Sequence, residues 1–370
     1  MVVGLLETQS LSKLNNVTLG KNPQNMSKAE RVAIIEKLQK ERGDTHLISY
    51  ITSTRANLEV EMAMDAVRLI YEHLLLIKKP RAEVSVDLFI HSNGGDGTVP
   101  WRLVTLIREY ASKLSVLVPY KAFSAATLTA LGADKIVMHP MGMLGPTDPT
   151  VANRFNPPDP NNPNSYLGIS VEDVTAYIAL IKEDAGIHHE DELVEAFKIL
   201  AEKVHPLALG NVKRSLSQSR MMARKLLALH MGSADAHKID EIVDSLTSKL
   251  YYHGHPINRQ EAAEQVGLST VEQPTAAVED LMWQLYLQYE SEIKMEQPFM
   301  AAIEFTSQFT SKVAAGGSLA PVTTAKLAFI ESVGRTDYVN MEYQLLGRPH
   351  PDTGGTQVNQ ILRQQSWQTE

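Results

Sequence analysis

One serine of this chain, Ser124, stands where a nucleophile could act. It lies in the stretch "YKAFSAATLTALGADKIVMHP", in which it follows Phe123 and opens a run of small and apolar residues that predicts a helix. Two interpretations compete. The hydroxyl can cap that helix, because a serine at the N-cap accepts a hydrogen bond from an unpaired backbone N–H group. Alternatively, the helix holds a nucleophile at its N-terminal end, where its dipole stabilises negative charge.

A pair of glycines supplies a second group that catalysis would need. The stretch "VSVDLFIHSNGGDG" predicts a strand that leads into Gly94 and Gly95, so bare backbone N–H groups lie at the carboxyl edge of a sheet, where open α/β sheets bind ligands. The alternative is a glycine turn without a ligand, and the segment matches neither the P-loop nor the dinucleotide fingerprint. Acyl transfer requires a nucleophile together with groups that bind the oxyanion, so the glycines favour the catalytic interpretation of Ser124.

The elements that must position these residues alternate along the chain. Apolar and β-branched runs predict strands over 46–53, 84–92, 114–119 and 134–140, with helices between them. Such alternation is typical of an α/β fold with a largely parallel sheet. Because the carboxyl ends of parallel strands meet at one edge of a sheet, we expect the glycine turn and the Ser124 turn to be neighbours.

The rest of the chain divides by composition. Residues 1–27 have the composition of a leader, and residues 28–273 form the core of alternating strands and helices. An aromatic-rich helix and a hairpin make up a C-terminal α+β extension over 274–346. The tail 347–370 is polar, and we expect it to be flexible.

Bulk composition narrows the classes of protein. The formal net charge is −8, with 44% hydrophobic and 21% charged residues, which is typical of a soluble globular protein and argues against a surface for nucleic acid or anionic membranes. The absence of cysteine excludes disulfides, thiolate nucleophiles and cysteine metal sites. We see no signal peptide and no apolar run of roughly 20 residues that could span a membrane. We therefore expect a cytoplasmic protein that needs no metal and no cofactor.

From about His46 to Leu268 the chain resembles the Clp/crotonase superfamily, and more closely the serine dehydrogenase proteinase family of Clp-fold serine peptidases. The resemblance rests on the strand ending in "NGG", on "SAATLTALGADKIVMHP", on the following "GPTDP" and on the closing "HGHPINRQEAAEQVGL". It implies a Clp/crotonase-like α/β fold with repeated ββα-type units. It also implies a serine endopeptidase that acts on peptides or proteins and assembles into a homo-oligomer.

The resemblance also implies roles for individual residues. Ser124 matches the nucleophile of the family. Gly94 and Gly95 match its oxyanion-binding loop, and the N–H group of Ala125 would be a further donor to the oxyanion.

The base and the acid are harder to assign. In the Clp proteolytic subunit a histidine follows the serine after one more strand, and here Thr147 or Asp148 stands at that place. The acid of that family precedes the closing helix, where this chain has His253 and His255. The resemblance therefore implies the order serine, aspartate, histidine, which is that of the serine dehydrogenase proteinases. The pattern His-x-x-Pro-Ile favours His253 as the base, whereas counting back from Gly267 without a gap favours His255.

Three alternatives remain open. Lys182 lies on a predicted helix where the related signal peptide peptidase A enzymes carry a lysine base, so a Ser–Lys dyad is possible. A crotonase-like acyl-CoA enzyme would use the oxyanion hole without a covalent serine. A scaffold that has kept the fold without catalysis would need neither group.

Overall fold

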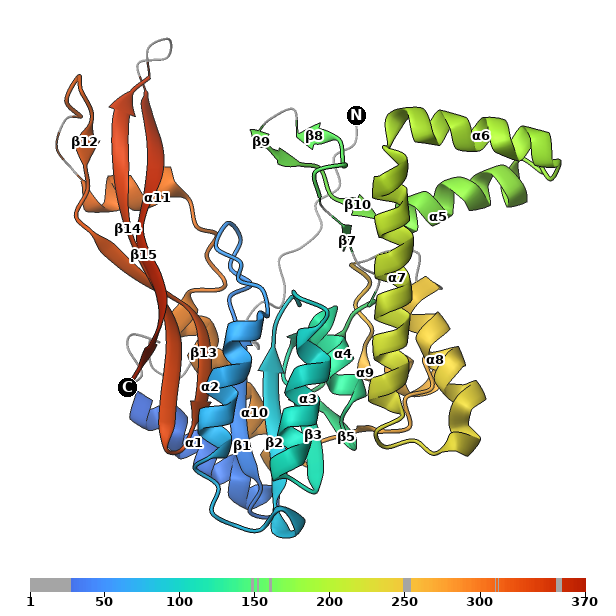
Figure 1. The fold of residues 1–370 in the computed structure, drawn as a ribbon. Helices are drawn as coiled ribbons and strands as arrows, with labels where there is room; N and C mark the ends of the chain where they lie inside the picture. Colours follow the sequence, from blue (N-terminus) through green and yellow to red (C-terminus); the bar gives the residue numbers. More distant parts are fainter. Residues whose placement is uncertain are drawn as a thin grey trace, which may run out of the picture.

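A mixed β-sheet runs through the centre of the protein (Figure 1). The computed structural model describes residues 28–147, 150–151, 153–159, 162–248, 254–309, 311, 313–350 and 355–370. Within these residues the central sheet has nine strands in the order β11-β5-β3-β2-β1-β13-β14-β12, and β15 also pairs with β14. The strands are β1 (His46–Thr52), β2 (Ser85–His91), β3 (Lys113–Val118), β5 (Lys135–Met138), β11 (Val271–Glu272), β12 (Ser318–Leu319), β13 (Thr323–Ser332), β14 (Arg335–Pro349) and β15 (Thr356–Thr369).

The first half of this sheet is parallel and the second half is antiparallel. The strands β1, β2, β3, β5 and β11 pair in parallel, whereas β13 pairs antiparallel to both β1 and β14. Strand β2 is buried at all positions after Ser85, because helices cover both faces of the sheet, which explains its nearly continuous apolar sequence. The predicted α/β class is thus confirmed with a mixed sheet, and the repeated ββα-type units stay a prediction.

Helices cover both faces of the sheet (Figure 1). On one face α2, α3, α4, α7 and α8 share a core with Ile48 and Leu88, and on the other face α1 and α10 pack against Leu47 and Phe89. Successive residues of a strand point to opposite faces, so Leu47 and Ile48 belong to different cores. The helices are α1 (Lys28–Glu41), α2 (Met64–Leu74), α3 (Val99–Tyr110), α4 (Ala125–Leu131), α5 (Val171–Ala179), α6 (Glu190–Lys203), α7 (Pro206–Leu227), α8 (Ala236–Ser248), α9 (Arg259–Glu264), α10 (Ala276–Ile293) and α11 (Ala301–Gln308).

The aromatic-rich helix predicted after residue 274 is α10. It buries Met282, Tyr286 and Tyr289 against the sheet, and the predicted hairpin is β13 and β14. Residues 28–273 and 274–346 therefore share one sheet in space. The division of the chain into domains stays a prediction about folding units.

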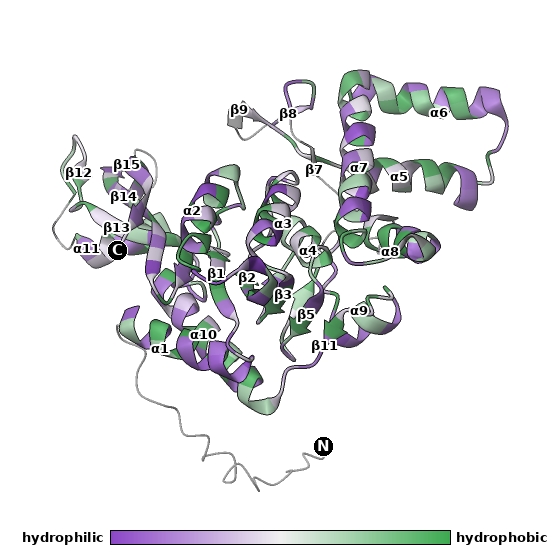
Figure 2. Ribbon diagram, turned by 60° about the horizontal axis from the view of Figure 1, so that its bottom comes forward, coloured by the Kyte–Doolittle hydropathy of each residue, from purple (hydrophilic) through white to green (hydrophobic). Residues whose placement is uncertain are grey.

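Two helices form an arm that projects from α7, away from the sheet (Figures 1 and 2). They are α5 and α6, joined through a π-helical turn, η2 (Leu180–Asp184). Helix α6, all of whose residues are described, buries none of them. The remaining short elements are η1 (Arg81–Glu83), β4 (Lys121–Ala122), β6 (Met143–Leu144), β7 (Thr150–Val151), β8 (Pro158–Asp159), β9 (Asn162–Tyr166), β10 (Ile169–Ser170) and η3 (Ser233–Asp235).

The expectation of a flexible tail after residue 347 is wrong for most of that segment. Strand β15 pairs along β14 from Asp337 opposite Thr369 to Pro349 opposite Thr356. The indole N–H group of Trp367 donates a hydrogen bond to the carboxylate of Asp65, 2.8 Å away. Polar composition misled the prediction, because a long neighbouring strand supplies main-chain hydrogen bonds that require no apolar side chains.

Candidate active site

The hydroxyl of Ser124 does not cap a helix. The residue joins β4 to α4 with φ 51° and ψ −112°, and its side chain makes no capping hydrogen bond. A non-glycine residue in this left-handed region costs about 1–3 kcal/mol and persists where its surroundings impose it, often at functional sites. The capping interpretation is therefore wrong.

The neighbouring strands impose this turn. The N–H group of Phe123 donates to the carbonyl of Ser92, 3.0 Å away, which ties the turn to the end of β2. The hydroxyl of Thr127 donates to the carbonyls of Ala122 and Gly145, at 2.7 and 2.9 Å. Every residue of α4 is buried, because its small side chains let the helix pack close to the sheet.

The glycine turn touches the Ser124 turn, as the sequence predicts. Gly94 has φ +104°, and a Cβ atom placed on it would lie 2.7 Å from the Cβ of Ser124 and 2.8 Å from the carbonyl oxygen of Phe123. Gly95 is packed as closely on its other side, where a Cβ would lie 2.4 Å from the carbonyl oxygen of Met62. Only glycine fits at either position, and the two turns form one surface.

Two of the three predicted oxyanion-binding residues present an unused N–H group. The N–H groups of Gly95 and Ala125 donate no hydrogen bond within the described part of the chain. For Ala125 this follows from its place, because the first N–H groups of a helix have no acceptor inside the helix. The N–H group of Gly94 is engaged by the hydroxyl of Ser92, 3.0 Å away, so Gly94 contributes close packing instead.

A cavity of about 470 Å³ opens beside these groups. Ser124 shares it with the glycine loop 93–97 and with the segment 59–61. Helix α7 closes another side with Ser215, Gln218 and Ser219. The cavity therefore joins the Ser124 hydroxyl and the glycine loop to a space that can hold a ligand.

Thr147 completes the wall of this cavity with an unpaired hydroxyl. Its side chain is 3% exposed, and its hydroxyl oxygen has no partner among the described residues. Its backbone is held, since its carbonyl accepts from the hydroxyl of Ser219 at 2.5 Å and its N–H group donates to Leu246 at 2.9 Å. Burying an unpaired hydroxyl costs about 1–3 kcal/mol, which a ligand that bonds to it would offset.

The structure describes only some of the residues predicted as base or acid. Asp148 and His253 lie outside the described residues. The ring Nε2 of His255 lies 2.7 Å from a carboxylate oxygen of Glu261, and two main-chain hydrogen bonds between Ile257 and Leu144 fasten this segment to β6, the neighbour of β4. His255 is not among the described residues that line the Ser124 cavity.

The sequence analysis did not predict Glu261 as a partner of His255. Its signal was present in the sequence, because Asn258 caps α9 by accepting from the N–H group of Glu261, 3.0 Å away. That cap fixes Glu261 in the first turn of the helix, six residues after His255.

The alternative base Lys182 lies far along the arm. It is exposed on η2, at the end of the arm opposite to α7 (Figure 1), and it does not line the cavity of Ser124. The structure therefore does not bring Lys182 and Ser124 together.

Comparison with known proteins decides the family. Residues 22–205 match the family model of the ClpP-like SDH-type serine proteinases. Through this segment the chain belongs to that family. The chain is also 24% identical to the uncharacterized protein MJ1495 of Methanocaldococcus jannaschii over 186 residues, 50% of this chain and 52% of the relative. It is 27% identical to the uncharacterized protein MJ0137 of the same organism over 194 residues, 52% of this chain and 56% of the relative. The chain spans about half the length of the curated relatives it matches.

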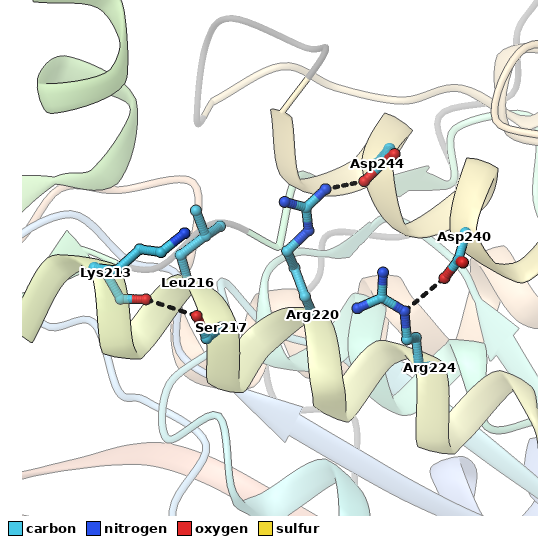
Figure 3. A pocket seen from close by; sticks show the side chains of 7 residues that line it. All are labelled: Lys213, Leu216, Ser217, Arg220, Arg224, Asp240 and Asp244. Carbon is cyan, nitrogen blue, oxygen red and sulfur yellow. Dashed lines mark hydrogen bonds and ion pairs between the residues drawn. The ribbon is translucent and has the colours of Figure 1, made fainter. Parts of the chain in front are cut away.

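Helices α7 and α8, which follow the matched segment of the chain, are joined by ion pairs (Figure 3). Arg220 pairs with Asp244, and the Nε of Arg224 lies 2.6 Å from an oxygen of Asp240. These residues line a separate hollow of about 370 Å³. Ser215 and Ser219 of α7 line the Ser124 cavity, so these ion pairs connect one wall of that cavity to α8.

The histidine closest in sequence to the glycine loop is a structural residue. Complete burial, together with the nearby charge of Lys121, lowers the pKa of His91 to about 3. Its ring stacks on Tyr120, and its Nδ1 accepts from the N–H group of Lys121 at 3.2 Å. His91 is therefore neutral and already engaged, which makes it unsuited to accept a proton from Ser124.

None of the helices formed by the described residues is both long and apolar enough to cross a bilayer. The described residues also contain no group of three or more histidine, aspartate or glutamate side chains arranged to hold a metal ion.

Proposed function

We propose that this member of the family is an endopeptidase that cleaves peptide bonds through an acyl-enzyme at Ser124. One observation carries the proposal: the Ser124 hydroxyl makes no capping bond, sits on a strained turn and lines a cavity beside two unused N–H groups. A helix cap or a packing serine would need none of these three features.

In the proposed reaction the Ser124 oxygen attacks the scissile carbonyl carbon, and its proton passes to a histidine. The carbonyl oxygen becomes an oxyanion that accepts hydrogen bonds from the N–H groups of Gly95 and Ala125. The histidine returns the proton to the nitrogen of the leaving amine as the C–N bond breaks. Water, deprotonated by the same histidine, then hydrolyses the ester and restores the serine. Loss of one such oxyanion donor costs about 10²–10³ in kcat in a well-studied serine protease.

We assign the base to His253 or His255 and the orienting carboxylate to Asp148. The contact of His255 with Glu261 supports a role for His255, because a carboxylate fixes the tautomer of an imidazole and stabilises its protonated form. In that case Glu261 shares or replaces the orienting role of Asp148.

A fluorophosphonate probe tests the nucleophile. We expect it to label the wild-type protein at Ser124 and to leave Ser124→Ala unlabelled. Ser215→Ala is the matched control, since Ser215 lines the same cavity from α7 and should leave labelling intact. Mass spectrometry of the labelled peptide locates the adduct. A folded wild-type protein that takes up no probe, or an adduct on another serine, would overturn the proposal.

We also propose that the protein works as a homo-oligomer. The exposed apolar side chains of α6 support this, because Val194 and Phe197 lie one helical turn apart and are 52% and 49% exposed. Sedimentation velocity of the wild type and of Val194→Glu with Phe197→Glu tests it, and a monomeric wild type would contradict it.

A further inference from the structure

We propose that the Ser124 cavity selects peptides that carry a lysine or arginine side chain next to the scissile bond, an inference that rests on the proposed function. Three carboxylates line the cavity: Glu59, Glu61 and Asp96. Among the described residues that line it there is no lysine, arginine or histidine. The wall beside the nucleophile thus has a formal charge of −3.

Two of these carboxylates flank the oxyanion-binding glycine. A Cβ atom on Gly95 would lie 2.9 Å from the Cβ of Glu61, so Glu61 packs directly against the loop. Asp96 follows Gly95 in the chain, and its N–H group donates to the carbonyl of Met62, 2.9 Å away, which fixes it on the same surface. Glu59 precedes Glu61 by two residues and lines the same cavity.

No described residue of the protein neutralises this charge. Glu59 and Glu61 form no ion pair with any described residue. Asp96 accepts hydrogen bonds from the N–H group and the hydroxyl of Thr98, at 2.8 and 2.7 Å, and neither donor is charged. A metal ion is not the expected occupant, because the described residues contain no carboxylate cluster suited to hold one.

Thr147 indicates independently that the cavity takes a ligand. Its hydroxyl is buried without a partner in the described part of the chain, and the residue lines the same cavity as the three carboxylates. A bound peptide can supply that partner with a main-chain group.

A cationic side chain would also assist the chemistry. Carboxylates beside Gly95 repel the negative charge that develops on the scissile oxygen, and a bound ammonium or guanidinium group offsets that repulsion. The selection therefore acts on the transition state as well as on binding, and it should appear in kcat as well as in KM.

The test compares peptides in which one position near the scissile bond is lysine or norleucine, which has a similar chain without the ammonium group. We expect the lysine peptides to be cleaved with about tenfold higher kcat/KM at low salt, since exposed ion pairs each contribute a few-fold and three carboxylates act together. The preference should shrink as the salt concentration rises. The combination Glu59→Gln, Glu61→Gln and Asp96→Asn should reduce it to less than about twofold. Glu109→Gln is the matched control and should leave the preference unchanged, because Glu109 is an exposed carboxylate near the C-terminal end of α3, whereas Asp96 precedes its N-terminal end.

Binding of the same peptides to Ser124→Ala, measured by fluorescence anisotropy, separates the two proposals. If Ser124→Ala prefers the lysine peptides but the wild type takes up no fluorophosphonate, the cavity inference stands and the peptidase proposal fails. If the wild type is labelled and cleaves lysine and norleucine peptides equally, the cavity inference is overturned and the peptidase proposal stands. Equal binding of both peptides to Ser124→Ala also overturns it.

Discussion

Replacement of Gly94 by alanine tests directly whether the glycine turn positions Ser124, the proposed nucleophile. The added methyl group would lie 2.7 Å from the Cβ of Ser124 and 2.8 Å from the carbonyl oxygen of Phe123. Carbon atoms in contact prefer about 3.5–4.0 Å, so either the Ser124 turn or the glycine loop must move by about 1 Å. The backbone adds a second source of strain, because a φ of +104° is itself unfavourable for alanine.

Two costs add in the Gly94→Ala protein. The unfavourable backbone contributes about 1–3 kcal/mol, and the overpacked contact contributes about 1–3 kcal/mol. Their sum of about 2–6 kcal/mol is a large part of the 5–15 kcal/mol that stabilises a typical protein. A nucleophile displaced by about 1 Å also loses about 10²-fold in rate. We therefore expect a protein that still folds, with a lower unfolding free energy and slow labelling.

The assay measures the second-order rate of fluorophosphonate labelling and the urea midpoint on the same samples. Gly97→Ala is the matched control from the same loop, since a Cβ on Gly97 meets no atom within 4 Å. It should change the unfolding free energy by less than about 0.5 kcal/mol and leave labelling unchanged. If Gly94→Ala is labelled and unfolds like the wild type, the contact between the two turns does not position Ser124.

Two further predictions concern histidines. The folded protein holds the pKa of His91 at about 3, below the usual value of 6.5, so between these values only the unfolded chain binds the proton and stability falls as the pH is lowered. We expect the free energy of unfolding, measured by urea titration, to fall less steeply with decreasing pH for His91→Phe than for the wild type, by up to about 1.4 kcal/mol per pH unit. Equal slopes for the two proteins would contradict a buried neutral ring. In peptide assays, one of His253→Ala and His255→Ala should lose about 10⁴-fold in kcat while the other loses far less. Full activity in both histidine variants, together with an inactive Lys182→Ala, would contradict the Ser-Asp-His triad and support the Ser–Lys dyad.

The neighbourhood of the two turns was predictable because it follows from topology. A strand that leads into Gly94 and the next strand, which leads towards Ser124, are parallel neighbours, as β2 and β3 show in their register of Phe89 opposite Leu117. The carboxyl ends of such strands must share an edge, whatever the side chains around them. The order of predicted strands and turns was therefore sufficient to predict that the hydroxyl and the glycines lie close together.

The conformation of Ser124 was not predictable from the same sequence. A serine before a run of small residues fits an ordinary cap, and the chain lacks the Gly-x-Ser-x-Gly pattern that marks a strained nucleophile turn. The strain is imposed by partners distant in sequence, namely the carbonyl of Ser92 and the close backbone of Gly94. The order of the sheet was hidden for a similar reason, since nothing local places β13 beside β1.

The site separates the groups that hold it from the groups that face the cavity. The holding groups, such as Ala126 and Thr127, are buried and satisfied by packing or hydrogen bonds, so a change in them should lower stability and activity together. The cavity groups, Ser124 and Thr147, have hydroxyls that form no hydrogen bond within the described residues. Removing these hydroxyls deletes no interaction among the described residues, so Ser124→Ala and Thr147→Val should retain stability while they alter catalysis and binding. A site built for packing would show the opposite: its hydroxyls would be satisfied, and their loss would destabilise the fold.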